Sequence, residues 1–83
     1  MNREFINICT EKTRYKILKY ILRNNPMTHQ PILYGINITS AKKLKAGAIR
    51  KHLWILRGIG AIIKEHNHYY VSNDVIAIFH LEQ

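Results

Sequence analysis

The segment from Lys45 to Ser72 constrains the fold most, because it joins a helical pattern to a pattern of two short strands. Its first half carries apolar residues at the spacing of one helix face, namely Ile49, Leu53 and Leu56. Gly58 or Gly60 can end that helix, since glycine readily adopts the left-handed conformation that follows many helices. Two runs rich in strand-forming residues then flank a turn at His66 and Asn67. This order predicts an α+β fold with a helix over about 45–58 and a hairpin over about 61–72.

The outer side of the 45–58 helix is charged and aromatic. When the apolar side is turned inward, the outward centre consists of Gly47, Lys51, Trp54 and Gly58, flanked by Arg50 and Arg57. Basic side chains beside a glycine allow a helix to approach a nucleic-acid backbone closely. This face is therefore the first candidate for a binding surface.

A second amphipathic helix is expected from Thr10, which can act as its N-cap, to a stop at Asn24, Asn25 and Pro26. Glu11 would lie in the first turn, where a negative charge is favourable. Apolar residues fall on one side of this helix, namely Ile17, Leu18, Ile21 and Leu22. Basic residues fall on the other side, namely Lys12, Lys16, Lys19 and Arg23.

The segments around these two helices are less regular. We expect a short helix over 29–37, capped by Thr28, and a long turn over 38–44 that lets Leu44 point inward. Residues 1–9 fit either a half-helix or an arm. The apolar stretch 75–81 fits either a helix or a strand. It must pack on the second amphipathic helix or on another copy of the chain, because each large side chain left wet costs about 1.5–3 kcal/mol.

Charge is the most informative property of the whole chain, whose 83 residues are expected to form a single domain, 1–83. The formal net charge is +8. The segment from Lys12 to Lys64 holds every lysine and arginine except Arg3, and it contains no acidic residue. A domain whose charges only solvate its surface normally mixes both signs. This distribution indicates a polyanionic partner.

Several classes of protein are disfavoured. No apolar run approaches the ~18 residues of a membrane span, and residues 1–12 resemble neither a signal peptide nor a transit peptide, so we expect a cytoplasmic protein with no membrane partner. Cys9 can form no internal disulfide, and we expect it to be a packing residue. The sequence has no glycine-rich phosphate loop and no paired acids, so we expect no enzyme activity, no cofactor and no small-molecule substrate.

Histidines offer the only candidate metal ligands, and we expect no metal site. His66 and His68 alternate on one strand face and could join His52 or His80 around a metal. No carboxylate or thiolate stands near them in sequence except Glu65, and turn histidines are commonly just polar residues. His52 lies at the edge of the apolar stripe, where a structural role is expected.

The 44–63 segment resembles the recognition helix and wing of winged helix-turn-helix repressors of the ArsR and MarR type. The residues that match their pattern are Ile49, Leu53, Leu56, Gly60, Ile62 and Ile63. The resemblance implies that the recognition helix enters the DNA major groove through Lys45, Ala46, Gly47, Arg50, Lys51 and Trp54. It implies wing contacts to phosphate or the minor groove through Lys64, His66 and His68. The chain departs from these families in its longer turn before the recognition helix and in lacking the cysteine ligands of the metal-sensing members.

The first hypothesis is therefore a sequence-specific double-stranded DNA-binding regulator of transcription that acts as a homodimer, free in a host cell or associated with the nucleoid. Lys42 and Lys43 would add phosphate contacts beside the recognition helix. The short chain also resembles small regulators of archaeal viruses or plasmids.

Three alternatives remain open beside the first hypothesis. The chain could be a non-specific nucleic-acid binder. It could be a winged-helix module for protein interaction that uses Trp54 and the apolar C-terminal stretch. The least favoured alternative is binding of RNA or single strands through Tyr69 and Tyr70, which requires exposed rings.

Overall fold

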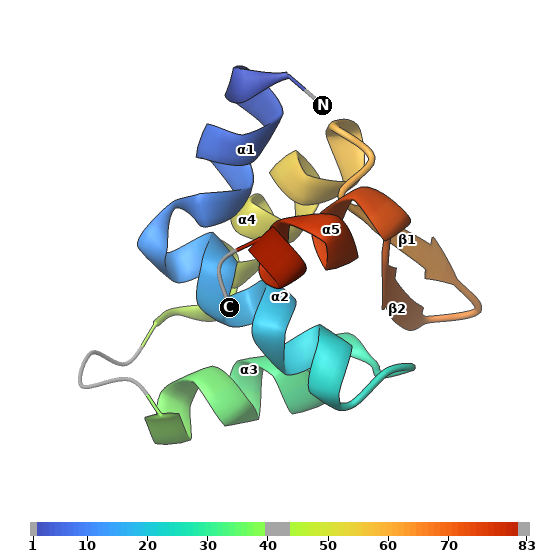
Figure 1. The fold of residues 1–83 in the computed structure, drawn as a ribbon. Coiled ribbons are helices and arrows are strands. Elements are labelled where there is room, and N and C mark those ends of the chain that lie inside the picture. Colours follow the sequence, from blue (N-terminus) through green and yellow to red (C-terminus); the bar gives the residue numbers. More distant parts are fainter. Residues whose placement is uncertain (1, 40–43, 82–83) are drawn as a thin grey trace.

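The computed structural model describes residues 2–39 and 44–81. That part of the chain forms α1 (Arg3–Thr10), α2 (Lys12–Arg23), α3 (His29–Thr39), α4 (Ala46–Gly58), β1 (Ile62–Glu65), β2 (His68–Val71) and α5 (Asn73–Leu81). In Figure 1, α2 runs through the middle of the molecule, α3 lies below it, α4 lies behind it, and the hairpin of β1 and β2 stands at one side. The predicted α+β class is confirmed.

The start of the chain is helical, and it displaces the cap expected at Thr10. Asn2 caps α1, because its side-chain oxygen accepts the Phe5 amide at 2.7 Å. Thr10 is thus already inside a helix, and its hydroxyl donates to the Ile6 carbonyl at 2.8 Å. The N-cap of α2 is instead Glu11, whose carboxylate accepts the Arg14 amide at 3.1 Å. The expectation of a Thr10 cap is therefore wrong.

The short helix expected over 29–37 is longer than predicted. α3 ends at Thr39 and not at residue 37, so the first two residues of the expected 38–44 turn are helical, while residues 40–43 lie outside the described part. Gly35, which should weaken a helix, is buried where the Tyr20 ring of α2 packs against the α3 backbone. Leu44 packs against the core as expected, and its amide donates to the Asn37 side chain at 3.2 Å.

The helix and hairpin of the 45–72 segment form where the sequence predicts them. Gly60, at φ 79°, follows the end of α4 in the left-handed conformation. Its amide donates to the Arg57 carbonyl, and the Ala61 amide donates to the Leu56 carbonyl at 2.9 Å, which is the hydrogen-bond pattern of a Schellman motif.

The hairpin turn and the strand register follow from two residues at the tip. His66 and Asn67 have φ values of 50° and 65°, as a two-residue type I′ turn requires. Ile62 therefore pairs with Val71 and Lys64 with Tyr69. The Tyr69 amide also donates to the Met27 carbonyl at 2.6 Å, so the hairpin is joined to the connection between α2 and α3.

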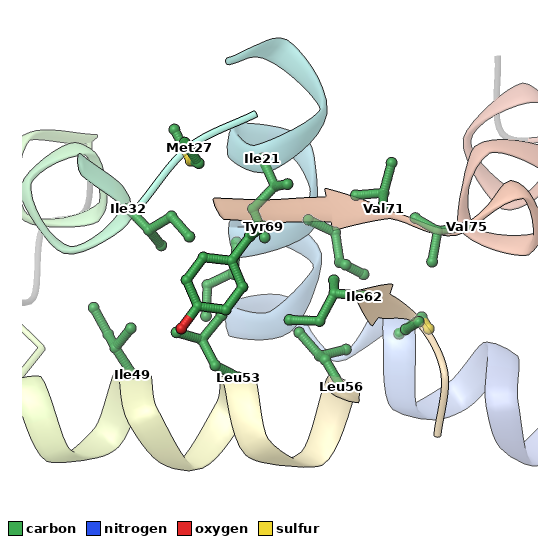
Figure 2. Close-up of a cluster of buried hydrophobic side chains, with 14 of the residues drawn as sticks. Ile21, Met27, Ile32, Ile49, Leu53, Leu56, Ile62, Tyr69, Val71 and Val75 are labelled. Atoms are coloured by element: carbon green, nitrogen blue, oxygen red, sulfur yellow. The ribbon is translucent and has the colours of Figure 1, made fainter. Parts of the chain in front are cut away.

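One core unites these elements. Figure 2 shows the ring of Tyr69 lying between Ile32 of α3 and the side chains of Ile49 and Leu53 of α4. The predicted inward set of α4 is confirmed, because Ile49, Leu53 and Leu56 are all buried.

The C-terminal stretch, which the sequence left open, is the helix α5. Val75, Ile78 and Phe79 are buried, and the Phe79 ring lies 4.9 Å from that of Tyr15 on α2. Burying these three apolar side chains stabilises the fold by about 1.5–3 kcal/mol each. Much of the apolar C-terminus is therefore covered within one chain. Within residues 2–39 and 44–81, no helix has the length and apolar character needed to cross a membrane.

Candidate nucleic-acid interface

The face of α4 that points away from the core is open and basic. Because Ile49 and Leu53 anchor the opposite side, Gly47, Arg50 and Lys51 are exposed. Trp54 lies on the same face and is 74% exposed. Lys45 is the N-cap of α4 and is exposed, whereas Ala46 is half-buried. The positive end of the helix dipole adds to the charge of Lys45 at this end of α4.

A hollow of about 270 Å³ lies between α4, the start of α3 and the hairpin. We call it the basic hollow, and its lining residues are His29, Arg50, Leu53, Trp54, Arg57, Lys64 and Tyr69. A second hollow, of about 380 Å³, adjoins it through the shared residues His29, Lys64 and Tyr69, and it extends to Thr28, Gln30 and Asn67. Arginine and lysine side chains from two elements therefore face one space, together with a histidine from a third.

Hairpin register decides which charges face the basic hollow. Lys64 and Tyr69 pair directly, so their side chains lie on one face of the hairpin. The Lys64 ammonium lies 5.8 Å from the centre of the Tyr69 ring, which favours the cation. Glu65 is the next residue along β1 and points to the opposite face. Among the described residues that line the two hollows, none is acidic.

His29 places an unsatisfied polar atom at this site. Its Nε2 is buried and has no hydrogen-bond partner within the described chain. Burial lowers the pKa of His29, and the nearby charges of Arg50 and Lys64 lower it further. An anion in the basic hollow would accept a hydrogen bond from the Nε2–H of the ring and would offset the charges of Arg50 and Lys64. The chemistry of the hollow thus suits a phosphate or another oxyanion.

His52 lies on the other flank of α4 and has structural contacts. Its Nδ1 is 3.3 Å from Nη1 of Arg14, and because arginine only donates, Nδ1 is the acceptor. Arg14 also donates from Nε to the Ile8 carbonyl at 2.6 Å. Burial lowers the pKa of His52, Glu11 raises it in part, and Arg14 lowers it again. His52 therefore joins α4 to α1 and α2 and is turned away from the exposed basic face.

The expected site residues fall into separate groups. Arg50, Trp54 and Lys64 meet at the basic hollow. Lys51 and Gly47 lie on the outer face of α4 but do not line that hollow. His66 is exposed at the hairpin tip. The half-buried His68 donates from Nδ1 to the backbone carbonyl of His66 at 2.9 Å. Lys42 and Lys43 lie outside the described residues.

Two of the basic side chains that line the hollow, Arg57 and His29, were absent from the expected DNA contacts. Arg57 follows Arg50 by seven residues, and helical spacing already places it on the flank of the outer face, although the resemblance implies no DNA contact for it. No sequence signal identifies His29, because it reaches the basic hollow only through the packing of α3 against the hairpin.

Other expectations meet the structure as follows. Tyr69, whose ring the single-strand hypothesis needs in solvent, is only 5% exposed. Cys9 is 1% exposed and packs in the core, as expected. Burial raises its pKa to about 11, against a smaller lowering by Arg14. Within the described residues, no three of the histidine, cysteine and acidic side chains gather as metal ligands.

Comparison of the chain with models of protein families, with curated proteins and with solved structures found no match.

Proposed function

We propose that this chain is a winged-helix protein that binds double-stranded DNA and regulates transcription in the cytoplasm. One observation carries the proposal: Arg50, Arg57 and Lys64 converge with His29 on one acid-free hollow beside the exposed face of α4. Surface charges that only solvate a domain are mixed in sign and scattered. Cations that converge from several elements fit phosphates, which carry the larger part of DNA-binding affinity.

The shape of the site supports the same partner. α4 has 13 residues and is therefore about 20 Å long. A helix of this kind fits the DNA major groove, which is about 12 Å wide. In this arrangement Lys45, Gly47 and Lys51 approach base edges and phosphates along the groove. The hairpin then lies along the backbone as a wing, with Lys64, His66 and His68 toward phosphate or the minor groove.

The order of elements also supports a winged helix. α2, α3 and α4 are followed directly by the hairpin, and an isolated bridge between Met27 and Tyr69 joins the hairpin to the connection before α3. This bridge fixes the hairpin beside the first turn of α3. The basic hollow depends on that placement, since His29 belongs to α3 and Lys64 to β1.

We further propose a homodimer, because helix-turn-helix dimers read two half-sites separated by about 34 Å, one turn of DNA. From the sequence, the apolar C-terminal stretch favours a dimer, because its side chains need a partner. In the structure this support is weaker, since Val75, Ile78 and Phe79 already pack within the chain. Leu81 stays 79% exposed. Sedimentation at micromolar concentration, with and without duplex, measures the mass, and a single-chain mass in both samples would contradict the dimer.

Fluorescence anisotropy with duplex DNA over a series of salt concentrations tests the function. A dimer that makes ~6 phosphate contacts should show a slope of log affinity against log salt near about −5. Replacing Arg50 or Lys51 by alanine should lower the preference for a selected site over random duplex and leave the thermal midpoint nearly unchanged, because both side chains are exposed.

The matched control is Arg3→Ala, which removes the same charge from the exposed surface of α1. It should leave the preference for the selected site intact. Affinity that does not depend on salt, or equal losses in Arg3→Ala and Arg50→Ala, would refute the proposed interface.

A protein-interaction module is the second candidate, and the 74% exposure of Trp54 favours it. Large exposed aromatic side chains are typical anchors of protein interfaces. Trp54→Ala separates the two functions: an interaction module loses its anchor, whereas most of the affinity for duplex rests on Arg50, Arg57 and Lys64, which this variant retains. A chain that binds no duplex at low salt would favour the interaction module.

A further inference from the structure

A second basic surface lies on α2, away from the proposed DNA-binding face. We call it the α2 basic face, and it consists of the exposed residues Lys12, Lys16, Lys19 and Arg23. At 100° per residue these four side chains centre opposite the buried side of α2, which holds Ile17, Leu18 and Ile21. The α2 basic face is therefore turned outward along its whole length.

The α2 basic face includes a shallow recess. A hollow of about 170 Å³ between α2 and α3 is lined by Lys16, Lys19, Tyr20, Arg23 and Ile36. The Lys19 ammonium lies 5.3 Å from the centre of the Tyr15 ring, a contact that holds this side chain against the helix.

No acidic residue of α2 or α3 neutralises this face. Glu11, the acid next to α2 in the chain, accepts the Arg14 amide and lies 3.9 Å from the Arg14 guanidinium. Within residues 2–39 and 44–81, none of the four cations forms an ion pair with an acid, so the charges of the α2 basic face are available to a partner.

The two basic surfaces point in different directions. α2 and α4 each contribute their apolar sides to the same core, so their exposed sides turn away from it. In Figure 1, α4 lies behind α2. A straight duplex lying on α4 therefore does not reach the α2 basic face.

We propose that the α2 basic face binds a second DNA duplex, so that the protein bridges two duplexes. This inference rests on the proposed function of α4 for the first duplex. The face runs over 12 residues of α2 and is about 18 Å long, and duplex DNA carries one charge per about 1.7 Å, so on the order of ten phosphate charges lie within its reach. A second copy of the chain is a poor occupant, because a symmetric pairing would place these cations against each other.

A capture assay tests the bridging. Beads carry one immobilised duplex, the full-length protein is added, and retention of a second, fluorescent duplex of unrelated sequence is measured. The wild-type chain should retain the second duplex. The triple variant Lys16→Gln, Lys19→Gln and Arg23→Gln should retain at least 10-fold less. Its anisotropy should still report binding of a single duplex, since α4 is unchanged.

Net charge needs a control, because the triple variant falls from +8 to +5, that is 8 − 3. A charge-matched variant with Arg3→Gln, Asn7→Glu and Asn73→Asp reaches the same net charge through exposed residues outside both basic surfaces. It should bridge as the wild type does. Circular dichroism confirms that both variants remain folded.

The outcomes separate this inference from the proposed function. If the wild type binds one duplex and retains no second, or if the α2 variant bridges normally, the bridging inference is wrong and the role of α4 stands. Equal loss of bridging in the charge-matched variant also overturns the inference. So does binding of polyglutamate to the α2 basic face with the same affinity as duplex DNA. If the α2 variant loses all DNA binding while Arg50→Ala and Lys51→Ala lose none, the proposed function of α4 fails.

Discussion

The effect of Gly35→Ala on the free energy of unfolding should depend on the residue at position 20, and its sign should change when the Tyr20 ring is removed. A Cβ built on Gly35 falls well inside van der Waals contact with the Tyr20 ring, which packs against the α3 backbone at that point. Overpacking of this kind costs about 1–3 kcal/mol. Alanine in place of a helical glycine stabilises the helix by about 1 kcal/mol. Taking 2 kcal/mol as the middle of the overpacking range, Gly35→Ala should lower the free energy of unfolding by about 1 kcal/mol.

Removing the Tyr20 ring should reverse this result. In the Tyr20→Ala background the steric cost is gone and the helix preference remains, so Gly35→Ala should raise the free energy of unfolding by about 1 kcal/mol. The coupling energy between the two positions is then about 2 kcal/mol, well above the limit of about 0.5 kcal/mol expected for independent sites.

Urea unfolding followed by far-ultraviolet circular dichroism measures all four proteins of this cycle. Trp54 fluorescence is a weaker probe, because this side chain is already 74% exposed in the folded chain. Gly47→Ala is the control, since no described residue has an atom within 4 Å of a Cβ there, and it should have the same effect in both backgrounds. Stabilisation by Gly35→Ala in the wild-type background, or additive effects in the cycle, would refute the packing of Tyr20 on α3.

Three further predictions concern single residues. The pKa of His29 is lowered from 6.5, so between that value and the lower native pKa the unfolded chain binds more protons than the folded chain. The free energy of unfolding should therefore fall as the pH drops below about 6.5. Urea titrations at pH 7.5 and 5.5 should show a smaller fall for His29→Gln than for the wild type. Asn67 has φ 65°, so Asn67→Ala should cost about 1 kcal/mol and lower the thermal midpoint by about 4–8 °C, whereas Asn67→Gly should not. A lowered midpoint for both variants would show that the turn conformation is not the cause. Cys9 has its pKa raised from 9.0 to about 11, so at pH 8 its thiolate fraction alone should slow a thiol reagent about 100-fold relative to the unfolded chain, and an equal rate in native and urea-unfolded protein would contradict its burial.

Those features of the fold that depend only on residues close together in the sequence could be predicted from it. The apolar spacing of Ile49, Leu53 and Leu56 identifies α4 and its inner side, because helical periodicity is a local property. Gly60 ends the helix, and Asn67 completes the hairpin turn, because few residues adopt positive φ values at low cost. The resemblance to winged helix-turn-helix repressors rests on the α4 residues and Gly60, together with Ile62 and Ile63, and DNA binding stays a proposal.

Features that depend on contacts between distant segments could not be predicted in this way. Thr10 has the chemistry of an N-cap, but it is the last residue of α1, the helix that Asn2 caps, and Glu11 is the N-cap of α2. α3 extends past residue 37 with its glycine facing the Tyr20 ring of another helix. The stretch 75–81 is apolar enough for a helix or a strand, and α5 forms with its apolar side on the core built by the other elements.

The candidate site divides in the same way. The sequence by itself determined that the chain is basic, that its acids lie outside the segment from Lys12 to Lys64, and that Arg50 and Lys51 occupy the outer side of one helix. Only the tertiary structure decided that His29 and Lys64 lie beside Arg50 around one hollow. The physical reason is that side-chain periodicity is set by local backbone geometry, whereas a binding hollow is set by how the shared core holds separate elements together.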